Sequence, residues 1–101
     1  MSSKAEIQTQ IAILRHQMEE LEKEINYCAP YKEYVKEQMA IQKLIINNSG
    51  DEAIRNVAWM DYEFHCGKLE EALKKERERE ERMRELRDAE RTLSMSLESA
   101  E

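Results

Sequence analysis

Apolar residues recur every three or four positions along the first quarter of the chain. The stripe consists of Ile7, Ile11, Leu14, Met18, Leu21, Ile25 and Cys28. Alternating steps of four and three residues keep these side chains on one side of an α-helix and are typical of a coiled-coil seam. Ser3 and Glu6 have the Ser-x-x-Glu spacing of a helix N-terminus. The pattern predicts a long helix, from about residue 3, that packs against another helix.

Pro30 interrupts this first predicted helix. Proline has no backbone N–H to donate and crowds the preceding turn. We therefore expect the helix to kink, or to end and restart, near residues 27–29. Apolar residues between positions 31 and 46 cover more than one side of the helix, which is predicted to reach about residue 46.

The clearest turn signal lies at residues 47–50, which read Asn-Asn-Ser-Gly. Ser49 and Glu52 form a second capping pattern, so a second helix is predicted from about residue 51 to about residue 97. The apolar stripe near its end consists of Met83, Leu86, Ala89, Leu93 and Leu97. A strict seam would put Glu90 at an apolar position, so the coiled-coil pattern is weaker here than in the first helix.

Two long helices around one short turn predict an all-α fold, a long antiparallel coiled-coil hairpin that forms a single domain over residues 1–101. If the turn is centred between Asn48 and Ser49, the residue numbers of opposed positions add up to about 97. Leu14 then lies opposite Met83. An alternative is a continuous helix after Pro30 that pairs in parallel with a second copy.

In this register, two groups of apolar residues would have no apolar partner on the opposite helix. Met18 and Leu21 would lie opposite polar positions near Glu76 and Arg79. Near the turn, neighbouring apolar residues point about 100° apart, so one partner helix cannot bury them all. A dimeric four-helix bundle centred there would cover them. The predicted dimer or partner interface contains Met18, Leu21, Tyr31, Tyr34, Ile45, Trp59 and Met60.

Composition and charge narrow the classes of partner. With 22 acidic and 16 basic residues, the chain carries a formal net charge of -6. An acidic chain is poorly suited to binding nucleic acid through its phosphates, or to an anionic membrane surface. No apolar run reaches the length of a membrane span, and the N-terminus does not resemble a secretory signal. Two cysteines do not form a disulfide framework, so we expect a cytoplasmic protein.

No catalytic, cofactor-binding or metal-binding residues are predicted. His65 and Cys66 are adjacent, so they point in different directions, and no Cys-x-x-Cys pair accompanies them. The chain contains no glycine-rich phosphate loop. Residues 74–91 hold eight basic and seven acidic residues, whereas a DNA-reading basic region is far more one-sided.

These observations favour a non-enzymatic protein–protein interaction module or assembly factor. It would act through an apolar helical surface and bind both a second copy of itself and another protein. The alternative is a small acidic inhibitor, of the kind that viruses encode, which blocks a host nucleic-acid-processing enzyme. Residues 1–73 support that alternative with 13 acidic and 8 basic residues.

Overall fold

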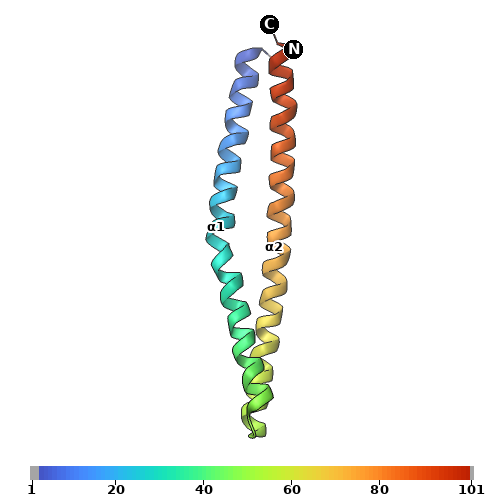
Figure 1. The fold of residues 1–101 in the computed structure, drawn as a ribbon. Coiled ribbons are helices and arrows are strands. Elements are labelled where there is room, and N and C mark those ends of the chain that lie inside the picture. The colour runs from blue at the N-terminus through green and yellow to red at the C-terminus, as the bar shows by residue number, and fades with distance from the viewer. Residues whose placement is uncertain (1–2, 101) are drawn as a thin grey trace. The chain divides into compact units, whose positions relative to one another are not determined.

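The computed structural model describes residues 3–100, and two α-helices account for almost all of them (Figure 1). Helix α1 spans Lys4–Asn48 and helix α2 spans Glu52–Ser99. The described residues contain no β-strand. The predicted all-α helical hairpin is confirmed. Neither helix has a stretch that is both long and apolar enough to cross a membrane.

Short polar side chains cap the start of both helices. The Ser3 hydroxyl accepts a hydrogen bond from the Glu6 backbone N–H, at 3.2 Å, as the sequence predicts. At the second helix the cap is Asp51, whose Oδ1 accepts from the backbone N–H of Ala53 at 2.9 Å. The predicted cap by Ser49 is therefore wrong. Ser49 instead directly follows the last residue of α1, where its N–H donates to the carbonyl of Ile45.

Helix α1 runs through Pro30 without a break. The expected end and restart near residues 27–29 is therefore wrong, while the expected kink stays a prediction. Proline leaves the carbonyl of Asn26 without its usual helical donor. Because Asn26 and Pro30 are both exposed, water can take the place of that donor.

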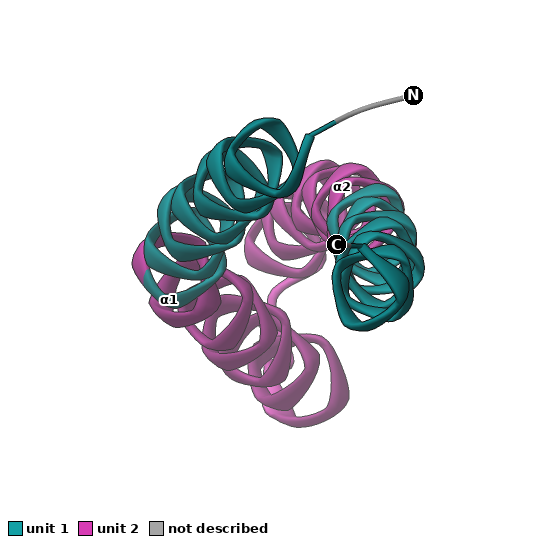
Figure 2. Cartoon of the chain, turned by 90° about the horizontal axis from the view of Figure 1, so that it is seen from above, with its two compact units in different colours: residues 1–26, 77–101 teal, residues 27–76 magenta. Residues whose placement is uncertain are grey.

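The chain divides into two compact units (Figure 2). In its described part, unit 1 combines residues 3–26 with residues 77–100, and unit 2 is residues 27–76. The buried core of unit 1 consists of Ile7, Ile11, Met83 and Leu86. The most deeply buried side chains of unit 2 are those of Val35 and Ala58. Each unit therefore holds a narrow core between one stretch of α1 and one stretch of α2.

The seam of α1 continues past the end of the stripe that the sequence shows. In unit 2 it includes Lys32, Val35, Met39, Gln42 and Ile46, all buried or half-buried. Its steps remain three and four residues, so the heptad pattern is unbroken. Because the seam residues Lys32 and Gln42 are polar, the pattern of apolar residues alone does not reveal this continuation.

Helix α2 also has a strict heptad seam. Its buried or half-buried positions are Arg55, Ala58, Tyr62, His65, Leu69, Ala72 and Glu76 in unit 2, then Arg79, Met83, Leu86, Glu90, Leu93 and Leu97 in unit 1. Glu90 occupies one of these positions, as a strict seam through this part of the helix requires. Charged residues occupy several seam positions that are apolar in an ordinary coiled coil.

Ion pairs between the helices show their register. Arg15 Nε lies 2.9 Å from Glu90 Oε1, and Arg79 Nε lies 3.1 Å from Glu24 Oε1. In unit 2, Lys32 Nζ lies 2.8 Å from Glu76 Oε2. The residue numbers of these pairs add up to 105, 103 and 108, so the predicted value of 97 is wrong by about one heptad.

If the residue numbers of opposed positions add up to 104, every seam residue of α1 is level with a seam residue of α2. Ile11 is then level with Leu93, and Val35 with Leu69. A shift of one heptad leaves the same faces in contact, so the apolar pattern alone fits both registers. The turn also lies further along the chain than assumed, because α1 includes Asn47 and Asn48.

Candidate interaction surface

Exposed apolar side chains are concentrated in unit 2. Twelve large apolar residues are exposed among residues 3–100, and ten of them belong to this unit. They are Tyr27, Tyr31, Tyr34, Ile41, Leu44, Ile54, Val57, Trp59, Met60 and Phe64. Only Ile13 and Met95 are exposed in the described part of unit 1. Monomeric proteins rarely expose large contiguous apolar patches, so unit 2 is the candidate interaction surface.

A second stripe runs along α1 beside its seam. It consists of Tyr27, Tyr31, Tyr34, Gln38, Ile41 and Ile45. Each member directly precedes a seam residue, so the stripe is rotated by about 100° from the seam. Gln38 and Ile45 are half-buried, and the other four are exposed. This face of α1 is therefore directed away from its contact with α2.

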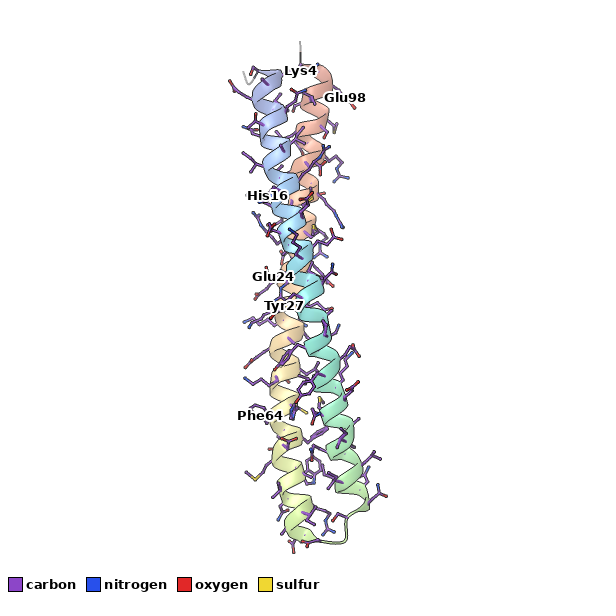
Figure 3. The ribbon with its side chains drawn as sticks, turned by 90° about the vertical axis from the view of Figure 1, so that its left-hand side faces the viewer. Lys4, His16, Glu24, Tyr27, Phe64 and Glu98 are labelled. Carbon is purple, nitrogen blue, oxygen red and sulfur yellow. The ribbon has the colours of Figure 1, made fainter. Side chains whose placement is uncertain are left out.

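Helix α2 carries a matching second stripe. Its members, Ile54, Val57, Asp61, Phe64, Lys68 and Glu71, also directly precede seam residues. Within this stripe, the ammonium group of Lys68 lies over the ring of Phe64, with 5.5 Å between Nζ and the ring centroid. Tyr27 and Phe64, labelled in Figure 3, each belong to one of the two stripes. We call the two stripes together the paired-stripe face of unit 2.

Trp59 lies on the other flank of the α2 seam, directly after Ala58. Its ring meets that of Tyr62 edge-on, with 5.7 Å between the ring centroids, yet 44% of the residue stays exposed. Lys43 Nζ lies 5.4 Å from the Tyr62 centroid and adds a cation–π contact from α1. Met60, the next residue, is 71% exposed. On this flank the exposed large apolar side chain is that of Trp59, which aromatic packing holds in place, whereas Met60 lies on the outer side of α2.

The structure brings five of the seven predicted interface residues into one unit. Tyr31, Tyr34, Trp59 and Met60 are exposed in unit 2, and Ile45 is half-buried there. The prediction did not include six further exposed apolar residues of unit 2: Tyr27, Ile41, Leu44, Ile54, Val57 and Phe64. Their positions just before seam residues are the signal that would have found Ile41, Ile54, Val57 and Phe64.

Met18 and Leu21 lie in unit 1 and are half-buried in the α1 seam. In the observed register they are level with Leu86 and Met83, which are buried. The polar neighbours expected for them are therefore wrong. Their predicted role in an interface stays a prediction, but its original reason no longer applies.

The polar groups near the Trp59 flank are engaged in local contacts. His65 Nδ1 lies 2.9 Å from the Asp61 carbonyl oxygen and 3.2 Å from Asp61 Oδ2. A hydrogen bond with the Cys66 side chain raises the pKa of Tyr62. Cys28 and Cys66 are free thiols. Within residues 3–100, no three potential ligands gather into a metal-binding group.

An open groove in the described part of unit 1 has a volume of about 480 Å³. It runs beside the first turns of α1 and includes Ile11, Arg15 and His16 together with Leu97 of α2. The Arg15 side chain is already paired with Glu90. The groove contains none of the predicted interface residues.

Comparison with protein-family models, with curated proteins and with solved structures finds no match to this chain.

Proposed function

We propose that this protein is a non-enzymatic coiled-coil interaction module or assembly factor that binds a protein partner through the apolar surface of unit 2. The observation that carries the proposal is the uneven distribution of exposed apolar residues between the two units. Burial of apolar surface contributes about 25 cal/mol per Å² before the costs of association, so such a surface favours binding.

The contrast with unit 1 supports this assignment. In unit 1 the two helices bury four large apolar residues and are linked by two cross-helix ion pairs. Little apolar surface is left over there for a partner. Unit 2 has the same seam geometry but leaves two flanks of apolar side chains exposed. Unit 2 therefore carries more apolar surface than the contact between α1 and α2 buries.

The spacing of the exposed residues indicates the kind of partner. Residues at steps of three and four along a helix present a ridge that fits the groove of another helix. We therefore propose that the partner contributes one or more amphipathic helices, as in helix-in-groove recognition. Trp59 is the natural anchor, since tryptophan is enriched among residues that dominate binding energy.

A capture experiment tests the proposal. Tagged protein is exposed to nuclease-treated lysate of its source cell at low and high salt, and retained proteins are identified by mass spectrometry. Apolar contacts are not screened by salt. We therefore expect a stoichiometric protein that stays bound at high salt and whose binding falls at least about tenfold with Trp59→Ala.

Met95→Ala is the matched control, because Met95 is exposed but belongs to unit 1. Equal capture by Trp59→Ala and wild type would contradict the role of the Trp59 flank. Retention of only a nucleic-acid-processing enzyme, and only at low salt, would favour the acidic-inhibitor alternative instead.

A further inference from the structure

We propose that the paired-stripe face of unit 2 binds a second copy of this chain, with the two hairpins side by side in the same direction and their turns at the same end. The inference rests on the proposed function and names one partner for one of the two apolar flanks. It leaves the Trp59 flank for a different protein.

The rotation of the stripes supports a four-helix arrangement. On both helices the second stripe is about 100° from the seam, which is close to the right angle at a corner of a four-helix bundle. A helix with two heptad stripes at that angle can pack against two neighbours at once. One neighbour is already present, since α1 and α2 pack through their seams.

Both stripes lie on the same side of the hairpin. An antiparallel helix pair has an approximate twofold axis perpendicular to the plane that contains both helices. That axis exchanges equivalent heptad flanks without moving them to the other side of the plane. In both helices the second stripe is the flank that precedes the seam, so α1 and α2 together form one face.

A twofold axis parallel to the helices brings the apolar and aromatic groups of the paired-stripe face together. This axis places the stripe of α1 against the α2 stripe of the other copy at the same level. Ile45 then lies between the partner's Val57 and Asp61, and Ile41 lies between the partner's Asp61 and Phe64. Tyr34 lies between the partner's Lys68 and Glu71, and the ammonium group of Lys68 can lie over the tyrosine ring.

The opposite orientation matches poorly. If the hairpins ran in opposite directions, each stripe would face its own copy. A pairing that places Tyr27 and Tyr31 on the partner's Ile45 and Ile41 would bring Lys68 against the partner's Lys68. Like charges opposed in an interface are unfavourable. The charges on this face therefore favour hairpins that run in the same direction.

The apolar area is sufficient for a stable dimer. Seven large residues of the face, Tyr27, Tyr31, Tyr34, Ile41, Ile54, Val57 and Phe64, are between 47% and 86% exposed. At about 100 Å² each, they offer about 700 Å² per copy, and a standard interface buries about 800 Å² per partner. A second copy supplies a face of this size and of the right heptad spacing.

Sedimentation equilibrium tests the dimer. The chain has a mass of 12.0 kDa, so the wild type is expected to sediment at twice that value at micromolar concentration. Ile41→Glu and Phe64→Glu each place two carboxylates, one from each copy, in the apolar interface. We expect each to raise the dissociation constant at least about 100-fold. Both residues are exposed within one chain, so helicity measured by circular dichroism should be unchanged.

Met95→Glu is the matched control, and it should leave the dimer intact. A wild type that sediments as a monomer overturns the inference, as does a dimer that neither variant weakens. A monomeric wild type that still captures a protein in a Trp59-dependent manner leaves the proposed function standing. Failure of the dimer and failure of the proposed function are thus distinguishable.

Cysteine crosslinking tests the orientation. Gly50 lies in the turn and Gly67 on the outer side of α2, and a Cβ at either position meets no atom within 4 Å. Each is changed to Cys in a Cys28→Ala, Cys66→Ala background and treated with a short bismaleimide. Hairpins that run in the same direction should crosslink through Gly50→Cys and not through Gly67→Cys. Crosslinking through Gly67→Cys without Gly50→Cys overturns the proposed orientation.

Discussion

Asp51 shows how one short side chain determines where α2 begins. Its carboxylate accepts hydrogen bonds from the backbone N–H groups of Ala53, at 2.9 Å, and Ile54, at 3.4 Å. These groups have no partner within the helix, and an acidic residue also interacts favourably with the positive end of the helix dipole. Ser49 has a supporting role, since its hydroxyl accepts from the Asp51 N–H at 3.2 Å.

Replacement of Asp51 tests this assignment of the cap. We expect Asp51→Ala to lower the free energy of unfolding by about 1 kcal/mol, measured by urea denaturation at fixed protein concentration. Asp51→Asn should retain most of the stability, because asparagine is also a good cap. Ser49→Ala is the comparison variant. A greater loss with Ser49→Ala than with Asp51→Ala would show that the cap is Ser49, as the sequence pattern suggests.

At the scale of the helices, charged seam residues determine the register. Glu76, Arg79 and Glu90 occupy seam positions of α2, and each is paired with an opposite charge on α1. A shift of one heptad would keep the apolar faces together but separate all three pairs. Exposed ion pairs each contribute little stability, yet together they distinguish registers that the apolar residues cannot.

Exchange of the charges of Lys32 and Glu76 tests this role. Each single change, Lys32→Glu or Glu76→Lys, opposes two like charges and should destabilise the protein. The double variant should recover part of the loss, with a coupling energy of about 1 kcal/mol in a double-mutant cycle. The same exchange at Glu20 and Lys23, a pair within α1, is the control and should show almost no coupling. Equal coupling in the two cycles would contradict the role in register.

The periodicity of the sequence was sufficient to predict the helices but not their alignment. The stripe from Ile7 to Cys28 and the turn signal at residues 47–50 place both helices within two residues of their observed bounds. The register depends on charged side chains at apolar seam positions, and a search for apolar residues passes over them. Pro30 was expected to be able to end the helix, but an exposed proline can be accommodated when water reaches the freed carbonyl.

At the scale of the whole molecule, the two units use one seam pattern to different extents. In unit 1 the exposed apolar residues are few, whereas unit 2 exposes ten large apolar side chains. The sequence pointed to this region through Tyr31, Tyr34, Ile45, Trp59 and Met60. The sequence pattern alone does not show which flank of the seam each of these residues lies on, because the seam residues must be known first. With the seam known, one flank suits a second copy and the other suits a different partner.

The most direct test of the account is sedimentation equilibrium of the wild-type protein at low and high salt. This experiment tests whether the paired-stripe face of unit 2 is buried between two copies of the chain. Hydrophobic association is not screened by salt, unlike contacts between exposed charges. We therefore predict a mass of twice 12.0 kDa at both salt concentrations. A monomer under both conditions, or a dimer that dissociates at high salt, would contradict the proposed dimer.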